Sequence, residues 1–212
     1  MTSFAAPHKK VFVAMSGGVD SSTVAALLCE AGCDVEGVTM CFELSPGPEA
    51  STRPNCCGLD AIEDARKVCR VLGIRHHVLN YGDALESLVI RNFVSEYASG
   101  RTPNPCIQCN RFLKFDRLLN DIHALGGEAI ATGHYAMIAR NDERGRWELR
   151  KAVDPKKDQS YFLYGIRREA LSRIVFPLGN VTKDKVRAMA MERGLPVAQR
   201  PDSQDICFVP AG

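Results

Sequence analysis

Ser16-Gly17-Gly18-Val19-Asp20-Ser21-Ser22 is the most informative segment for the fold class of this 212-residue chain. It follows the apolar run 11–15, which predicts a buried strand of a parallel sheet. After it, apolar residues recur at helical spacing until Gly32, where a helix is expected to end. Glycines let backbone N–H groups approach an anion, hydroxyls add donors, and a helix N-terminus carries partial positive charge. The stretch therefore predicts a phosphate cradle.

The same stretch excludes two other nucleotide loops. It lacks the GxxxxGK[ST] pattern of a Walker loop, and it lacks GxGxxG. A glycine-rich turn with a serine N-cap is the simpler structural interpretation, but it accounts poorly for so many donors directly after a buried strand.

Outward from the cradle, strand and helix patterns alternate. We expect strands at 35–42, 77–79 and 129–131, and helices at 62–72, 84–98 and 110–124. An antiparallel hairpin at the sheet edge is expected near 135–150, and irregular loops at 43–58 and 100–105. The pattern predicts an α/β fold with a doubly wound, mainly parallel sheet.

Composition sets broad limits. With 45% hydrophobic residues the chain can bury one large domain. No run of eighteen apolar residues and no signal-peptide pattern occur, so we expect a cytoplasmic protein with no membrane contact. A net charge of +2 is too small to argue for nucleic acid. Basic residues do cluster around the CxxC pair and at 150–157, although such clusters are more often solvated faces.

Nine cysteines need an explanation that fits a reducing compartment. Cys106 and Cys109 form a CxxC pair that follows two prolines and is expected to open a helix, and a thiol at a helix N-terminus generally has a lowered pKa. The third candidate is Cys207. Structural burial is the favoured interpretation of four others: Cys29, Cys33, Cys41 and Cys69.

Two metal alternatives stay open at this point. A structural zinc site would need further ligands such as Cys56 and Cys57, but adjacent cysteines lack the usual spacing. An iron–sulfur cluster held by Cys106, Cys109 and Cys207 is chemically sensible.

Longer motifs carry a family resemblance. SGGVDSS resembles the pyrophosphate (PP) loop of the ATP pyrophosphatases, which implies the adenine nucleotide α-hydrolase-like fold. Five further motifs follow it in order, namely GRTPNPCIQCNRFLKF, ATGHYA, KDQSYFLY, FPLGNVTKDKVR and DSQDICFV. Together they resemble the tRNA-specific 2-thiouridylases of the MnmA type over nearly the whole chain.

This resemblance implies a tRNA-uridine 2-sulfurtransferase that uses ATP and Mg²⁺. Such an enzyme adenylates the C2 carbonyl of the wobble uridine in tRNAs for Lys, Glu and Gln. Sulfur from a cysteine persulfide then gives 2-thiouridine, AMP and pyrophosphate. The implied partners are tRNA and a sulfur donor, either a relay protein or a cysteine desulfurase. We expect residues 1–209 to form the catalytic domain, and 210–212 to start a linker to central and β-barrel domains absent from this chain.

The resemblance also implies roles for individual residues. Cys207 is expected to carry the persulfide and Cys109 to release its sulfur through a transient disulfide. Cys106 stands where some relatives have an aspartate, a candidate general base, so a thiolate replaces it or the CxxC serves a cluster. The residues expected to bind ATP are Ala14, Met15, Ser16, Gly17, Gly18, Val19, Asp20, Ser21, Met40 and Gly133. Those expected to contact tRNA are Asn104, Pro105, Cys106, His134, Lys157, Asp158 and Gln159.

Two rival functions differ in how they use the thiols. Another adenylating pyrophosphatase, with an amine nucleophile, would not need the CxxC pair. A non-catalytic nucleotide or iron–sulfur binding module would release no pyrophosphate on addition of tRNA.

Overall fold

A computed structural model describes residues 9–42, 59–202 and 206–208. At its centre lies a five-stranded sheet with the order β3-β2-β1-β4-β7, in which every pairing is parallel. The strands are β1 Lys10–Ala14, β2 Asp34–Cys41, β3 His76–Asn80, β4 Ala129–Ala131 and β7 Ile174–Val175. The chain runs outward from β1 to β3 and then returns to β4 on the other side of β1. This reversal creates a switch point between β1 and β4, where sheets of this kind bind ligands.

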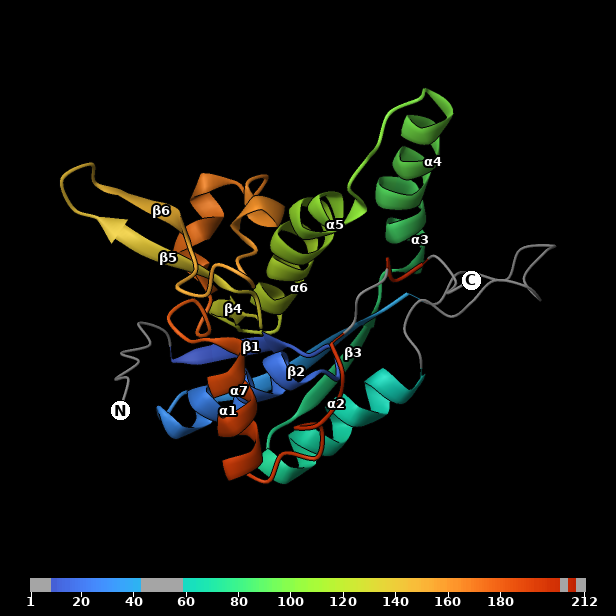
Figure 1. Cartoon of the computed structure of the whole chain (residues 1–212). Coiled ribbons are helices and arrows are strands. Elements are labelled where there is room, and N and C mark those ends of the chain that lie inside the picture. The colour runs from blue at the N-terminus through green and yellow to red at the C-terminus, as the bar shows by residue number, and fades with distance from the viewer. Residues whose placement is uncertain (1–8, 43–58, 203–205, 209–212) are drawn as a thin grey trace.

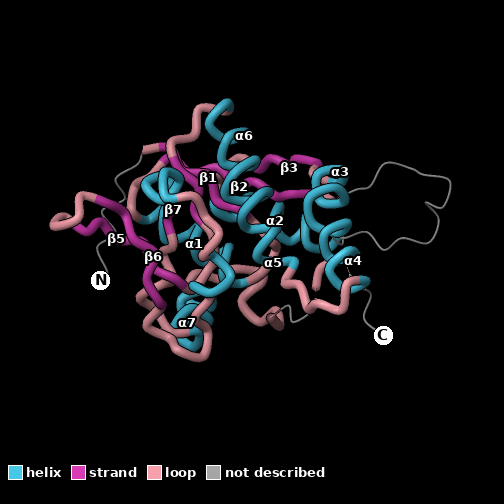
Figure 2. Tube along the Cα trace, turned by 90° about the horizontal axis from the view of Figure 1, so that it is seen from above, coloured by secondary structure: helices cyan, strands magenta, loops and turns pink. Residues whose placement is uncertain are grey.

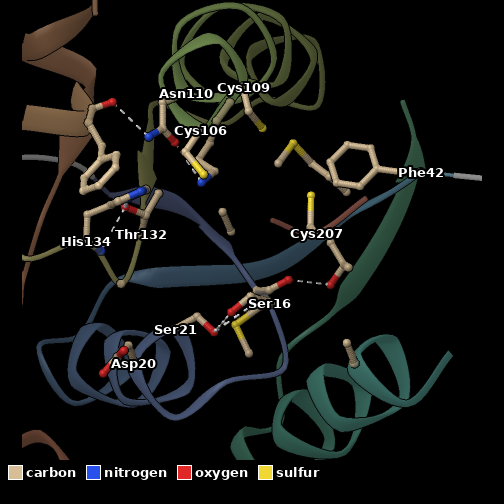
Figure 3. Close-up of a pocket in the computed structure, with 18 of the residues that line it drawn as sticks. Ser16, Asp20, Ser21, Phe42, Cys106, Cys109, Asn110, Thr132, His134 and Cys207 are labelled. Atoms are coloured by element: carbon tan, nitrogen blue, oxygen red, sulfur yellow. Dashed lines mark hydrogen bonds between the residues drawn. The ribbon is translucent and has the colours of Figure 1, made fainter. Parts of the chain in front are cut away.

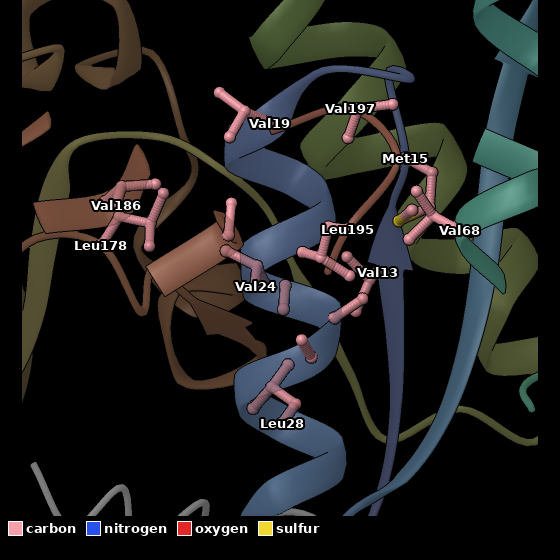
Figure 4. Close-up of a cluster of buried hydrophobic side chains, with 14 of the residues drawn as sticks. Val13, Met15, Val19, Val24, Leu28, Val68, Leu178, Val186, Leu195 and Val197 are labelled. Atoms are coloured by element: carbon pink, nitrogen blue, oxygen red, sulfur yellow. The ribbon is translucent and has the colours of Figure 1, made fainter. Parts of the chain in front are cut away.

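Helices cover both faces of the sheet, as the alternating pattern predicted (Figure 1). One face carries α1 Val19–Glu30, α2 Leu59–Leu72 and α7 Lys183–Glu192. The other carries α3 Gly82–Leu85, α4 Arg91–Ala98, α5 Pro105–Gln108 and α6 Leu118–Ala124. Side chains alternate along β1: Val11 and Val13 enter the core under α1, and Phe12 enters the opposite core. Figure 4 shows the first core, where Val24 and Leu28 of α1 pack near Val13.

Two predicted helices contain wider π-helical segments. The helix expected at 84–98 includes η2 Glu86–Ile90, and the one expected at 110–124 includes η3 Cys109–Arg117. Inside a longer helix, a π segment shifts the side chains that follow it to a different face, and such segments often occur at functional sites. Here η3 begins at the second cysteine of the CxxC pair.

The predicted hairpin is present, but it is not an edge of the main sheet. β5 Ala136–Asn141 and β6 Arg146–Lys151 pair in antiparallel register as a separate two-stranded sheet. β7 takes the edge position instead, because Ile174 and Val175 pair with β4. Both views of the whole chain show the hairpin extending away from the main sheet (Figures 1 and 2). Two 3₁₀ segments, η4 Ser160–Leu163 and η5 Arg168–Arg173, follow it.

Some predictions fall outside the described residues. These are the irregular loop at 43–58 with Cys56 and Cys57, and the linker at 210–212. In the described part of the chain, no helix combines the length and apolar character needed to span a bilayer.

Candidate functional site

The turn between β1 and α1 has the geometry of an anion cradle. Gly17 adopts a φ of +70°, and a Cβ there would lie 2.4 Å from the carbonyl oxygen of Ala61. Only glycine therefore fits. Gly18 is the N-cap of α1, and no side chain caps the helix at this end. The Ser21 hydroxyl accepts from the Ser16 N–H at 3.2 Å and donates to the Gly18 carbonyl at 3.2 Å, which holds the turn closed.

Gly133 brings the end of β4 against the first turn of α1. A Cβ at this position would lie 2.8 Å from the Asp20 Cβ and 2.9 Å from the Ser21 nitrogen. Any larger residue would push the two segments apart. The close approach places the carboxyl end of β4 beside the cradle, at the switch point of the sheet.

The Asp20 carboxylate, in the first turn of α1, is paired with other side chains. Both of its carboxylate oxygens lie 2.7 Å from Nζ of Lys183, and the Tyr135 hydroxyl donates to Oδ1 at 2.9 Å. Lys183 is the first residue of α7 and is only 7% exposed. Asp20 therefore joins the first turn of α1 to α7 and to the residue that follows His134.

The CxxC pair opens a helix, as predicted from the two prolines. Asn104 is the N-cap of α5, and its side chain accepts from the Cys106 N–H at 3.1 Å. Pro105 occupies the first helical position, where its missing N–H is not needed. Cys106 is exposed and Cys109 is half-buried. A rigid N-terminal turn thus presents both thiols.

The predicted lowering of the thiol pKa is wrong for Cys109. Burial raises the pKa of Cys109, and the nearby positive charge of Lys114 opposes this effect without cancelling it. The helix start does not dominate because Cys109 lies one full turn into the helix, where removal from water outweighs the helix dipole. Cys109 is consequently a neutral thiol at neutral pH.

Lys114 and Asn110 form a polar pair beside this thiol. The Lys114 ammonium donates to Oδ1 of Asn110 at 3.0 Å, and the Asn110 amide donates to the carbonyl of Phe162 at 3.1 Å. Asn110 is 4% exposed, so its amide is fixed by partners and not by water. The pair connects η3 to η4 across the site.

His134 lies between aromatic rings at the end of β4. Its Nδ1 is 2.6 Å from the Thr132 hydroxyl, and its ring lies 5.7 Å from the rings of both Phe115 and Phe176. Burial, with a smaller effect of Lys114, places the pKa of His134 well below its ordinary value. The imidazole is therefore neutral at physiological pH and suited to hydrogen bonding.

Residues before and after Cys207 in the sequence make contacts with the rest of the fold. Downstream, the ring of Phe208 packs edge-on against Phe93 of α4 at 5.4 Å. Upstream, Asp202 lies 2.8 Å from the side-chain nitrogens of Lys157, Lys183 and Arg187. Lys157 and Lys183 hold the pKa of Asp202 at about 2 despite its partial burial. The segment thus has an ionic anchor before the thiol and an aromatic anchor after it.

Cradle and thiols meet in one cavity of about 860 Å³ at the carboxyl ends of β1, β2 and β4. Figure 3 shows Ser16, Ser21, Cys106, Cys109 and Cys207 around the same space. Val38 and Met40, near the end of β2, form an apolar wall next to the cradle. The predicted site residues that line the cavity are Ala14, Met15, Ser16, Asp20, Ser21, Met40, Pro105, Cys106, Cys109, Gly133, His134, Gln159 and Cys207.

Other predicted site residues do not line the cavity. Gly17 and Gly18 shape the turn, and Val19 is buried in the core under α1. Asn104 caps α5, and Lys157 pairs with Asp202. Asp158 accepts from the Ala152 N–H and the Ser160 hydroxyl, each at 2.8 Å, so its carboxylate holds its own loop.

Sequence reasoning missed four polar residues of this site. Asn110 and Lys114 follow the CxxC pair at a spacing of four, which places them on one helix face and was a usable signal. Lys183 and Asp202 gave no such signal, because only the tertiary fold brings them to Asp20. Among the described residues, no three His, Cys, Asp or Glu side chains are gathered closely enough to hold a metal ion.

Comparison with known proteins gives a family for this geometry. The family model described as the tRNA methyl transferase HUP domain matches residues 9–211. The tRNA-specific 2-thiouridylase MnmA 1 of Syntrophus aciditrophicus is 54% identical over 95% of this chain and 53% of its own length. The MnmA of Pelotomaculum thermopropionicum is 52% identical over 94% of this chain and 55% of its own. The chain thus spans about half the length of the curated relatives it matches.

Solved structures show the fold. A 4-thiouridine synthetase in complex with RNA and ATP superposes with a TM-score of 0.56 at 20% identity, over 91% of this chain and 43% of that one. The NMN synthetase of Francisella tularensis gives 0.54 at 16% identity, over 93% and 67%. Both likenesses confirm the predicted doubly wound α/β architecture. From the extent of the family match, the chain belongs to the tRNA methyl transferase HUP domain family, and the curated relatives it resembles share the name tRNA-specific 2-thiouridylase MnmA.

Proposed function

We propose that this chain carries the catalytic centre of a tRNA 2-thiouridylase. It would adenylate the C2 carbonyl of the wobble uridine in tRNAs for Lys, Glu and Gln and replace its oxygen by sulfur. One observation carries the proposal: a phosphate cradle and three cysteines, Cys106, Cys109 and Cys207, line a single cavity. Neither an amine-transferring pyrophosphatase nor a methyl transferase needs thiols beside an anion cradle.

ATP fits the cradle side of the cavity. The uncapped start of α1 and the hydroxyls of Ser16 and Ser21 are suited to phosphate oxygens. The apolar strand ends at Val38 and Met40 are suited to the adenine ring. Of the predicted ATP residues, Gly17 and Gly133 would act through backbone conformation and close packing.

A Mg²⁺ ion would supply charge neutralisation on the pyrophosphate leaving group. Mg²⁺ is usually held by one or two carboxylates together with substrate phosphates. Asp20 lines the cavity beside the cradle and is the carboxylate suited to this task, although Lys183 contacts both of its oxygens here.

The thiol side of the cavity is suited to an extruded base and to tRNA. Cys106 and Pro105 line it next to His134, whose neutral imidazole is suited to hydrogen bonding with a nucleotide. Asn104, Lys157, Asp158 and Gln159 remain proposed tRNA contacts. Cys106, in the place of a candidate general base, is exposed to whatever enters the cavity.

The chemistry would run in two stages. Attack of the uridine O2 on the α-phosphate of ATP forms the adenylate and expels pyrophosphate. The terminal sulfur of a Cys207 persulfide then bonds to C2, or is delivered there as hydrosulfide, and AMP departs with the original oxygen. In either route the Cys109 sulfur attacks the Cys207 sulfur, which breaks the persulfide bond and leaves a Cys109–Cys207 disulfide. A dithiol reductant returns both thiols.

Burial of Cys109 agrees with its role as the second nucleophile. Its raised pKa keeps it protonated until a base removes the proton. This delay would prevent Cys109 from discharging the persulfide before a substrate arrives. The sulfur donor would be a relay protein or a cysteine desulfurase.

A [4Fe–4S] cluster on Cys106, Cys109 and Cys207 is the second candidate for the thiols. The solved U34-tRNA thiolase NcsA of Methanococcus maripaludis, at 20% identity and a TM-score of 0.50, carries such a cluster. The described residues of this chain do not fit it, because the three thiols are not gathered into a metal-binding group. We therefore derive no step through a cluster.

Mass spectrometry of tRNA nucleosides tests the proposed function. After incubation of the protein with ATP, Mg²⁺, a persulfide donor and tRNA, we expect 2-thiouridine together with equal amounts of AMP and pyrophosphate. Alkylation of the exposed thiols beforehand should stop the reaction. Unchanged pyrophosphate release after alkylation would instead support an amine-transferring enzyme.

A further inference from the structure

Lys183 contacts two carboxylates that line the cavity, one on the phosphate side and one at the start of the segment that carries Cys207. Its ammonium lies 2.7 Å from both oxygens of Asp20, in the first turn after the cradle, and 2.8 Å from Oδ1 of Asp202. Both carboxylates line the cavity, whereas Lys183 itself is 7% exposed and lies behind them. One buried cation therefore joins the phosphate side to the chain segment that leads to Cys207.

The position is electrostatically unfavourable for a lysine unless its charge is paired with those carboxylates. Lys183 is the first residue of α7, where the helix dipole repels a positive charge. Burial adds a desolvation penalty, so an ion pair of this kind is weak evidence of a contribution to stability. Its geometry instead fixes where Asp20 and Asp202 sit.

Anchoring Asp202 limits the position of Cys207. Cys207 lies five positions after Asp202 in the sequence, so an extended chain between their Cα atoms spans at most about 18 Å. Lys157 and Arg187 also contact Asp202, but they are 38% and 30% exposed at the side chain, so solvent weakens those two pairs. Lys183, at 9% side-chain exposure, is the most buried of the three cations that contact Asp202 and the least screened by solvent.

We propose that Lys183 is a positioning residue that couples the phosphate cradle to the Cys207 segment and thereby holds Cys207 within reach of Cys109. Its consequence for turnover rests on the proposed function, but the coupling itself is a property of the folded chain. The coupling can be measured without tRNA or sulfur transfer.

The test is the rate at which diamide oxidises Cys109 and Cys207 to a disulfide, in a Cys106→Ser background. Diamide accepts the two electrons and two protons that the thiols lose, and mass spectrometry of the linked peptides quantifies the product. We expect Lys183→Met to slow this rate at least about tenfold, because an untethered thiol has a lower effective concentration. Lys183→Arg keeps a cation and should stay within about threefold of the parent rate.

Arg193→Met is the matched control. Arg193 follows α7 and pairs with Glu30 of α1 through two contacts of 2.7 Å, so it also joins these two helices, but away from the cavity. Its loss should leave the disulfide rate within about twofold of the parent if only the cavity link matters. A fall equal to that of Lys183→Met would mean that any loosening of α7 has the same effect, and would overturn the proposal.

A double-mutant cycle tests the coupling across the cavity. Asp20→Asn should slow disulfide formation about threefold in the parent and have no further effect in Lys183→Met, because both changes break the same link. Additive effects would contradict a shared link. If Lys183→Met does not fold by circular dichroism, Asp202→Asn takes its place and should slow the reaction at least about threefold. A folded Lys183→Met or Asp202→Asn protein with the parent rate would overturn the proposal.

Discussion

The two walls of the cavity are built in different ways. The cradle wall is backbone: the turn after β1, the uncapped start of α1, and Gly133 pressed against Asp20 and Ser21. The thiol wall is side chain: Cys109 on a π-helical turn, and Cys207 on a segment held by Asp202 and Phe208. A backbone wall can be read from a short stretch of sequence, whereas a side-chain wall depends on contacts between distant residues. The walls should therefore respond to different substitutions.

The largest expected effect is a loss of thiolation without a loss of ATP binding. We predict that Cys109→Ser and Cys207→Ser each lower thiolation at least about 10³-fold, because each removes a nucleophile that no other group replaces. ATP affinity should stay close to that of the parent, since neither thiol belongs to the cradle. Parallel measurement of 2-thiouridine yield and nucleotide binding checks this. Thiolation near the parent rate in either variant would mean that the thiol roles are assigned wrongly.

The second prediction concerns a substitution that disturbs only the cradle wall. Gly133→Ala inserts a Cβ 2.8 Å from Asp20, so α1 and the end of β4 must separate. ATP affinity should fall about tenfold to 100-fold, which corresponds to about 1.4 to 2.7 kcal/mol. Gly165→Ala is the control, because the nearest atoms to its Cβ would belong to the flexible Arg111 side chain, at 3.3 Å or more. Equal ATP affinity in the two variants would show that the close approach at Gly133 does not shape the cradle.

The third prediction concerns the electrostatics of the thiol wall. Burial raises the pKa of Cys109 and Lys114 lowers it, so Lys114→Met should raise this pKa further. Alkylation of Cys109 by iodoacetamide at pH 8 should then slow about threefold to tenfold, because less thiolate is present. Mass spectrometry follows Cys109 in this variant and in Arg111→Met, an exposed control on the same helix. In the parent the rate should keep rising with pH beyond 9; a plateau near pH 7 would contradict the raised pKa.

The smallest effect concerns the anchor of the Cys207 segment. Asp202 has a pKa of about 2 in the folded chain against an ordinary 3.8, so its pairing stabilises the fold above pH 4 and is lost as the pH falls towards 2. Asp202→Asn should cost about 1 kcal/mol of unfolding free energy at pH 7, because partial exposure screens the pairs. Urea unfolding of both proteins between pH 3 and 7 should show the difference shrinking with acid. A difference independent of pH would exclude this ion-pair origin.

The contrast between the walls also explains what sequence could predict. The strand at 129–131 and the helix ending before Gly73 follow from local apolar spacing and were confirmed. A helix opening at the CxxC pair was predicted from the two prolines for the same local reason, and α5 begins there, at Pro105. Local patterns did not reveal the π-helical turn at Cys109 or the separate sheet of the hairpin, because both depend on packing.

Local sequence patterns could not predict the interactions between residues that are far apart in the sequence. Cys109 and Cys207 are far apart in the sequence, and their shared cavity was predicted from family resemblance. The raised pKa of Cys109 depends on burial that no spacing rule reports. Lys183 meets Asp20 and Asp202 through the tertiary fold alone, since nothing in its own segment marks it.

A single-turnover experiment tests most directly whether both walls serve one reaction. The protein is loaded with one labelled sulfur on Cys207 and mixed with ATP, Mg²⁺ and tRNA in the absence of reductant. We predict labelled 2-thiouridine, AMP and the Cys109–Cys207 disulfide in equal amounts. Labelled 2-thiouridine formed while Cys109 remains a free thiol would contradict this prediction.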